Sequence, residues 1–356
     1  MRALVALLDD LESPFWTDTQ LEVQALKDAS EVVLVGLETD GSVPEILRQS
    51  DAIIVSHSPR VGSQLLDQLK NTRVVVRNGV GVDNVDLEAA RRLAIPVCHV
   101  PDYGTEEVAD HALMLTLCLE RKLDLVLKEV RQGSWSWQAA GEIRRLRGLR
   151  FGIVGCGRIG TATALRAKVF GYRVQFFDPY ISSGYEKALG IDRVMSLERL
   201  LDSSDVISLH TPLTPETLGM LDSRAFSIIK HGALLINTAR GALVNERALL
   251  EALRSGTLGG VGLDVLEREP RLDLDLLQFS NCLITPHSAF YSSSALLEMR
   301  TTSCQIVNRV LGGELPINVV NGTFGPRQRS SPSLGSRHQE NNLQQRDLRS
   351  IVMQDL

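Results

Sequence analysis

Apolar runs alternate with amphipathic segments along the first hundred residues. The runs are short and rich in Val and Ile, which is typical of strands buried in a parallel sheet. The segments between them, such as Leu21–Ala29 and Leu65–Leu69, have helical spacing. We therefore predict a βαβ domain of the doubly wound type. Its strands are expected at Ala3–Leu8, Val32–Val35, Ile53–Val55, Val74–Val76 and Pro96–Val100.

A longer helix is expected after this domain. Thr105 is a candidate N-cap, and Glu106 and Glu107 would lie in the first turn, where the helix dipole favours acids. The helical pattern continues to about Val130 and stops at Gly133, so we predict one helix that spans between domains or subunits. Its apolar stripe consists of Val108, Ala112, Leu115 and Leu119.

A second alternating series begins at Arg150 and predicts a second parallel-sheet domain. Within it, Asn245 is expected to cap a helix over Ala248–Leu253. A last helix, over about Ser292–Leu311, is expected to return the chain to the first domain. The strands of this series are expected at Phe151–Val154, Val174–Phe177, Val206–Leu209, Ala233–Ile236, Gly260–Val265 and Cys282–Thr285.

Composition changes this picture at the end of the chain. From Asn321 the sequence is rich in Ser, Gln, Asn, Gly and Arg and poor in apolar residues. Such a segment cannot bury enough surface to offset its ordering entropy, so we predict a disordered tail over residues 321–356.

Charge and cysteine content narrow the class of protein. The 356 residues carry a formal net charge of −5, which argues against nucleic acid as a partner. The five cysteines form no CxxC pair, and reduced thiols favour a cytoplasmic location. The apolar run at the amino terminus ends at Asp9, so a first strand is expected there, and no run is long enough to cross a membrane. No Cys/His cluster indicates a metal site.

The stretch FGIVGCGRIG, residues 151–160, combines a strand, a glycine turn and the start of a helix. This context makes GxGxxG a usable dinucleotide-binding fingerprint. Gly155 would allow the tight turn, Gly157 the approach of a pyrophosphate, and Gly160 the packing of the helix on the strand. Asp178 lies eighteen residues later, close to the ~20 expected for the ribose-binding acid. The following Pro179 offers no charge for a 2′-phosphate, so we predict NAD; the alternative is a strand-end turn aspartate.

Residues suited to hydride-transfer chemistry follow the strands of the second domain. The guanidinium of Arg240 suits a substrate carboxylate, and His287 suits proton exchange near neutrality. Glu269 could orient the imidazole, although Glu267 competes for that role. Taken singly, each has a plainer interpretation as a surface ion pair or a turn residue. Their expected placement on one sheet edge favours a catalytic site, with His210 as a wall of the cofactor pocket.

Eight motifs together resemble the D-isomer-specific 2-hydroxyacid dehydrogenase family, over about residues 50 to 320. Within it the chain is most similar to the branch named after C-terminal binding protein, a corepressor, and its bacterial dehydrogenase relatives. The motifs are RNGVGVDNVD, VPDYGTEEVADHAL, GIVGCGRIG, FFDPY, LHTPLTPET, INTARGALVNERAL, GLDVLEREP and TPHSAFYS.

The resemblance implies a flavodoxin-like substrate domain from both chain ends (residues 1–100 and 289–320) and an inserted Rossmann NAD domain (residues 101–288). It implies a homodimer whose arm is the long helix from Thr105. The family's catalytic residues fall on Arg240, Glu269 and His287, and its substrate-binding positions on Val80, Gly81, Arg240 and His287. Its NAD-binding positions fall on Val154, Gly155, Gly157, Arg158, Ile159, Gly160, Asp178, His210, Thr211, Pro212, Thr217, Thr238, Ala239, Arg240, Asp264 and His287.

Three functions follow from this pattern. The first is an NAD-dependent dehydrogenase that interconverts a small 2-keto acid and its D-2-hydroxy acid. The second is an NAD(H)-sensing dimer of the corepressor type that binds peptide partners. The third is another use of the glycine loop, such as FAD or S-adenosylmethionine binding, with the Arg, Glu and His idle.

Overall fold

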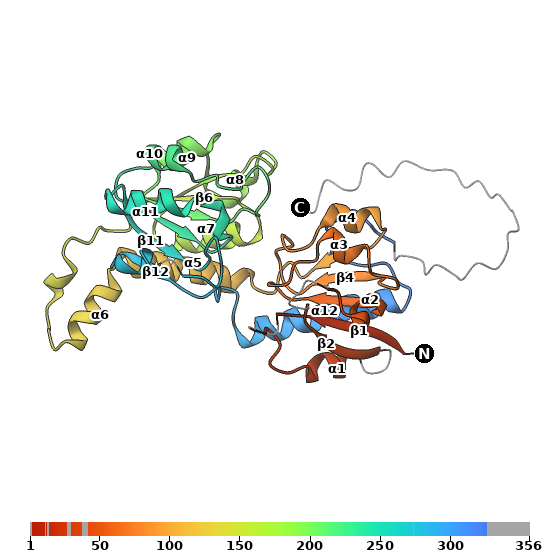
Figure 1. The fold of residues 1–356 in the computed structure, drawn as a ribbon. Helices are drawn as coiled ribbons and strands as arrows, with labels where there is room; N and C mark the ends of the chain where they lie inside the picture. Colours follow the sequence, from red (N-terminus) through yellow and green to blue (C-terminus); the bar gives the residue numbers. More distant parts are fainter. Residues whose placement is uncertain are drawn as a thin grey trace, which may run out of the picture. The chain divides into compact units, whose positions relative to one another are not determined.

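The computed structural model describes residues 2–10, 12, 14–26, 30–37, 42–272 and 274–325 (Figure 1). The chain forms two compact units. Unit 1 contains the residues up to Pro101 and those from Arg300 onward, and unit 2 is Asp102–Met299. Most of the predicted tail, residues 326–356, lies outside the described residues.

Unit 1 is built on a five-stranded parallel sheet, as the apolar runs predicted. The strand order is β2-β1-β3-β4-β5, so the order in which successive strands are added reverses between β1 and β3, in the manner of a doubly wound fold. The strands are β1 (Ala3–Leu8), β2 (Ser30–Val35), β3 (Ala52–Val55), β4 (Val74–Arg77) and β5 (Val97–His99).

Helices cover both faces of this sheet because successive strand residues point to opposite faces. Ala6 and Leu8 pack with α2 (Glu45–Gln49), α3 (Ser63–Leu66) and α4 (Leu87–Arg92). Val5 and Leu7 pack on the other face, with α1 (Gln20–Leu26) and the last turns of α12 (Ser293–Leu311). Both faces are therefore apolar, which explains why the strands read as continuous apolar runs.

The segment after α12 is ordered further than we predicted. An antiparallel bridge joins Cys98 to Val319 beside β5. The Asn321 side chain is buried; its Oδ1 accepts from the Val97 N–H at 3.1 Å, and its Nδ2 donates to the Ile95 carbonyl at 2.8 Å. The prediction that disorder begins at Asn321 was wrong, because its amide satisfies two buried backbone groups.

Unit 2 is built on a seven-stranded parallel sheet with the order β12-β11-β10-β9-β6-β7-β8. The order reverses between β6 and β9, which places the crevice for a ligand at the carboxyl ends of these two strands. Six strands match predicted runs, and β8 was not predicted because it has only two residues. The strands are β6 (Arg150–Val154), β7 (Arg173–Phe177), β8 (Asp192–Arg193), β9 (Val206–Leu209), β10 (Ala233–Asn237), β11 (Leu258–Leu263) and β12 (Cys282–Ile284).

Helices also sandwich the sheet of unit 2. One face packs on α9 (Leu197–Ser203), α10 (Ser223–Ile228) and α11 (Glu246–Arg254), and the other on α5 (Thr105–Glu120) and α7 (Arg158–Val169). Two α/β units with parallel sheets confirm the predicted fold class. The remaining helical segments are α6 (Leu123–Arg131), α8 (Tyr185–Leu189), η1 (Trp137–Ala140), η2 (Gly241–Leu243) and η3 (Leu276–Gln278).

The single long helix expected from Thr105 is two helices. Lys122 adopts a left-handed conformation with φ 50°, which interrupts the helical hydrogen bonds between α5 and α6. The N-cap of α5 is Gly104 rather than Thr105, whose hydroxyl donates instead to Asp102 Oδ1 at 2.8 Å. A continuous apolar pattern could not reveal a backbone change at one lysine.

The segment 289–299 belongs to unit 2, whereas we expected the return to the first domain at residue 289. Two hydrogen bonds hold it there. The Ala289 N–H donates to Asp264 Oδ2 at 2.9 Å, and the Ser292 hydroxyl donates to Glu107 Oε1 at 2.7 Å.

Within the described residues, no helix has the length and apolarity needed to cross a membrane.

We predict that Asn321→Ala destabilises unit 1 by about 2–3 kcal/mol, because it leaves one N–H and one C=O buried without partners. Urea unfolding followed by tryptophan fluorescence measures this. Trp16 is buried in unit 1, whereas Trp135 and Trp137 are already exposed in the folded chain, so Trp16 dominates the change in fluorescence on unfolding. Thr323→Ala is the matched control, and a midpoint for Asn321→Ala equal to that of the control would contradict the prediction.

Candidate active site

The functional residues predicted in unit 2 lie at the carboxyl ends of its parallel strands. Asp178 follows β7, and His210 follows β9. Thr238 and Arg240 follow β10, two strands from β12, after which His287 lies. Because parallel strands end at the same edge of a sheet, these side chains share that edge.

The glycine loop lies at the reversal point between β6 and β9. Gly155 has φ +87°, and a Cβ there would approach the His210 carbonyl carbon to 2.9 Å. A Cβ at Gly160 would overlap with the Gly155 carbonyl oxygen, so α7 packs directly on the loop. At Gly157 nothing lies within 4 Å of the Cβ position, which leaves room for a ligand against the backbone. Arg158 and Ile159 begin α7, whose N-terminal N–H groups suit an anion.

Asp178 is tied to the glycine loop. Its Oδ2 accepts from the Cys156 N–H at 2.8 Å, and its Oδ1 accepts from the Tyr180 N–H at 2.9 Å. A half-buried carboxylate that is held by two amides has a fixed direction. It still has lone pairs for the hydroxyls of a ribose.

The segment after β9 forms a closed turn. Thr217 Oγ1 donates to the Pro212 carbonyl at 2.7 Å and accepts from the Thr214 N–H at 2.8 Å. Thr211 packs against the glycine loop, where a Cβ on Gly155 would meet its methyl group at 2.8 Å. The His210 ring pairs with Ser208 Oγ at 2.8 Å, and desolvation lowers the pKa of His210 to about 3. This imidazole is therefore neutral at physiological pH.

The turn after β10 presents Thr238 and Arg240. The Asn237 side chain braces the turn: its Nδ2 donates to the Arg240 carbonyl, and its Oδ1 accepts from the Ala239 N–H. Arg240 is half-buried, and one of its guanidinium nitrogens donates to the Ala239 carbonyl at 2.7 Å. Thr238 Oγ1 is buried without a hydrogen-bond partner among the residues that the structure describes. A buried hydroxyl in this situation suits a polar group of a bound ligand.

His287 and Glu269 form a direct pair. Nδ1 of the imidazole lies 2.7 Å from Glu269 Oε2, and both side chains remain about one-third exposed (31%). The other oxygen, Oε1, accepts from the Leu266 N–H at 2.9 Å, which fixes the carboxylate. Glu267, the competing candidate, is exposed and contributes its backbone N–H to Glu246 instead. The structure therefore pairs Glu269, not Glu267, with the histidine.

Asp264 has a role that sequence reasoning missed. It is buried, and its carboxylate accepts from the Thr285 hydroxyl at 2.6 Å and from the Ser288 and Ala289 N–H groups at 2.9 Å each. These bonds hold the turn in which His287 has φ 51°. The NAD contact that the resemblance implied for Asp264 stays a prediction.

His111 on α5 was also missed. Its Nε2 lies 2.9 Å from Thr285 Oγ1 and 3.6 Å from Asp264 Oδ1. Burial lowers the pKa of His111, and the nearby Asp264 carboxylate partly opposes this shift. The sequence pattern on α5 showed only the apolar stripe, so this contact between distant segments gave no signal.

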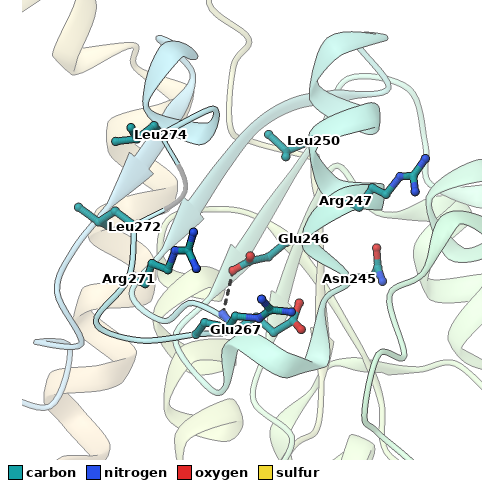
Figure 2. Close-up of a pocket in the computed structure, with 9 residues that line it drawn as sticks. Asn245, Glu246, Arg247, Leu250, Glu267, Arg271, Leu272 and Leu274 are labelled. Carbon is teal, nitrogen blue, oxygen red and sulfur yellow. Dashed lines mark hydrogen bonds between the residues drawn. The ribbon is translucent and has the colours of Figure 1, made fainter.

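The first residue of α11, Glu246, holds the loop that carries Glu269. The Glu246 carboxylate accepts from the Glu267 N–H at 2.9 Å, as Figure 2 shows. A Cβ at Gly241 would overlap with the backbone of Leu266, so the Arg240 turn and the Glu269 loop are in direct contact. A cavity of about 640 Å³ lies between α11 and this loop, lined by Asn245, Glu246, Arg247, Leu250, Glu267, Arg268, Arg271, Leu272 and Leu274.

Val80 and Gly81 belong to unit 1, in the loop after β4, where both are half-buried. His99, the last residue of β5, contacts this loop through Nδ1, which lies 2.7 Å from the Val80 carbonyl oxygen. The loop that contains the two predicted substrate-binding residues is therefore in contact with a histidine that the motifs did not single out.

Unit 2 matches the family described as "D-isomer specific 2-hydroxyacid dehydrogenase, NAD binding domain" over residues 113–289. The chain is 35% identical over 326 residues to C-terminal-binding protein 1 of Caenorhabditis elegans, covering 88% of this chain and 44% of the relative. It is 33% identical over 307 residues to D-3-phosphoglycerate dehydrogenase of Methanocaldococcus jannaschii, covering 86% of this chain and 58% of the relative. The chain thus spans about half the length of these two relatives.

One similar solved structure is matched over nearly its entire length. D-lactate dehydrogenase from Aquifex aeolicus, complexed with NAD and lactic acid, is 30% identical with a TM-score of 0.79. The match covers 87% of this chain and 96% of that chain. The chain belongs to the D-isomer specific 2-hydroxyacid dehydrogenase family, as its motifs indicated.

We predict that Gly241→Ala destabilises unit 2 by about 1–3 kcal/mol, because the new methyl group must displace the Leu266 backbone. Urea unfolding followed by far-UV circular dichroism measures the loss, and a crystal structure should show the Glu269–His287 contact broken. Gly157→Ala is the control, since a methyl group there meets nothing within 4 Å. Equal stability of the two variants would contradict the close contact at Gly241.

The lowered pKa of His210 predicts a stability change with pH. The unfolded chain gains a proton on this residue near pH 6.5, whereas the folded chain does not until about pH 3. Stability is therefore lost as the pH falls below about 6.5, by about 2 kcal/mol between pH 7 and pH 5. Comparing His210→Gln with the unaltered protein at both pH values isolates this contribution. An identical pH dependence for the two proteins would show that the ring is solvated.

Proposed function

We propose that the protein is an NAD-dependent dehydrogenase that interconverts a small 2-keto acid and its D-2-hydroxy acid. The observation that carries the proposal is the Glu269–His287 pair, 2.7 Å between Oε2 and Nδ1, at the sheet edge that also holds the glycine loop. Family membership supports the same reaction class.

The residues of unit 2 fit NAD. The open space at Gly157 and the α7 N-terminus suit the pyrophosphate, and Asp178 suits a ribose without a 2′-phosphate. The partnerless Thr238 hydroxyl suits a polar group of the cofactor. Bound NADH would supply the hydride.

His287 is the residue that we expect to donate and accept the proton. A carboxylate can only accept a hydrogen bond from Nδ1, so Glu269 holds the ring in the tautomer or charge state with hydrogen on Nδ1. We assign the other nitrogen, Nε2, to the substrate oxygen: it donates a proton when the carbonyl carbon receives the hydride and takes it back in the reverse reaction.

Charge recognition completes the proposal. The Arg240 guanidinium, braced by its own turn, would bind the substrate carboxylate and the developing oxyanion. In unit 1, the family resemblance assigns the N–H groups of Val80 and Gly81 to the substrate carboxylate. Backbone N–H donors suit a carboxylate because their direction is set by the fold.

The test is NADH oxidation by the purified chain, followed spectrophotometrically with glyoxylate, pyruvate, hydroxypyruvate and 2-oxoglutarate, and repeated with NADPH. We expect turnover with at least one keto acid, a preference for NADH, and a roughly 10²–10⁴-fold loss of kcat in His287→Ala. His231→Ala is the matched control because this exposed histidine precedes β10, at the opposite edge of the sheet. The proposal fails if no acid gives turnover above that of His287→Ala.

A second candidate function is an NAD(H)-sensing dimer of the corepressor type, which the 35% identity to C-terminal-binding protein 1 favours. The dimer itself would use α6, none of whose residues is buried in the single chain. Its apolar side chains are 41–44% exposed at Leu123, Leu127 and Val130. Size-exclusion chromatography with and without NADH distinguishes the two functions, since a dimer indifferent to the cofactor leaves only the enzyme.

A further inference from the structure

The loop after β4 presents two peptide groups in a defined orientation. Gly79 has φ 138°, a conformation that turns the chain away from the strand. Neither the Val80 N–H nor the Gly81 N–H donates a hydrogen bond to another atom in the described part of unit 1. Both residues are half-buried, so these two donors are partly shielded and available to a ligand.

The carbonyl of each of these two peptide groups is held by the end of β5. The Val100 N–H donates to the Gly79 carbonyl at 3.1 Å, and that carbonyl shares a peptide group with the Val80 N–H. His99 Nδ1 lies 2.7 Å from the Val80 carbonyl, which shares a peptide group with the Gly81 N–H. His99, the last residue of β5, and Val100, which follows it, therefore fix two consecutive peptide groups of the loop.

The state of the His99 ring follows from its partner. A carbonyl oxygen can only accept, so Nδ1 carries the hydrogen. In a trans peptide the C=O and N–H bonds point in opposite directions, so a donor fixed on the Val80 carbonyl directs the Gly81 N–H away from His99. Chains of hydrogen bonds also polarise one another, so the same contact makes the Gly81 N–H a stronger donor.

Other contacts fix the rest of the loop without His99. Arg77 donates to the Asn78 carbonyl at 2.6 Å, and the Ser303 hydroxyl donates to Asn78 Oδ1 at 2.9 Å. Asn84 Nδ2 donates to the Ser56 and Pro59 carbonyls at 2.9 and 2.8 Å, which ties this loop to the one after β3. Removing the His99 ring should therefore change one peptide group and leave the loop in place.

We propose that His99 is a positioning residue that orients and polarises the Val80–Gly81 peptide group, through which unit 1 binds the carboxylate of a 2-keto acid. This role rests on the proposed function. In this role His99 acts through the Gly81 N–H and not through a contact of its own with the substrate.

The test compares His99→Leu, His99→Gln and His99→Asn with the unaltered chain, using the best keto acid of the panel above. The Asn side chain can place its NH₂ group where Nδ1 lies, whereas that of Gln reaches one bond further. We expect KM to rise roughly three- to tenfold in His99→Leu and His99→Gln and to return to within about twofold in His99→Asn. The value of kcat should change by less than about twofold, since the lost interaction binds substrate and transition state alike.

A second readout reports on the peptide group itself. In a ¹⁵N–¹H NMR spectrum without substrate, the Gly81 amide proton should move upfield in His99→Leu and His99→Gln and recover in His99→Asn. If His99→Leu fails to fold, the His99→Gln and His99→Asn pair still decides the question. Turnover with an unchanged KM and an unchanged Gly81 shift would overturn the role of His99 alone. A complete lack of turnover in the unaltered chain would overturn the proposed function together with this role.

Discussion

The hydrogen bond between Glu269 and His287 depends on how closely the backbone segments behind it approach each other. The loop that carries Glu269 contacts Gly241 so closely that no side chain fits, and Glu246 holds the next amide. On the other side, the buried Asp264 holds the turn that carries His287. Each partner of the pair is thus fixed by a carboxylate and by contacts made with the backbone.

The strands were predictable because burial on both sheet faces leaves unbroken apolar runs in the sequence. The glycine loop was predictable because the strand, turn and helix that define it are adjacent in sequence. The break at Lys122 was not, since one left-handed residue changes no hydrophobic pattern. The buried Asn321 was missed for a similar reason: a polar residue in a polar stretch reads as solvated until its backbone partners are known.

The candidate site shows the same limit. Arg240, Glu269 and His287 could be chosen because their side chains have the chemistry of the reaction and each follows a strand. Asp264 was chosen for the cofactor, yet in the structure its oxygens hold Thr285, Ser288 and Ala289. His99 and His111 were passed over, because their partners are a carbonyl and a hydroxyl from remote segments. Reactive side chains are easier to identify from the sequence than side chains whose role is to hold other groups in place.

Each unit has main-chain N–H groups that are suited to binding an anion. In unit 2 these are the amides at the start of α7, where the space at Gly157 lets a ligand approach. In unit 1 they are the amides of Val80 and Gly81, whose peptide carbonyls are held by His99 and Val100. A backbone donor fixed at its carbonyl end loses no side-chain entropy on binding, whereas a lysine or arginine would. This explains how a chain with an acidic net charge of −5 can still suit an anionic cofactor and a carboxylate substrate.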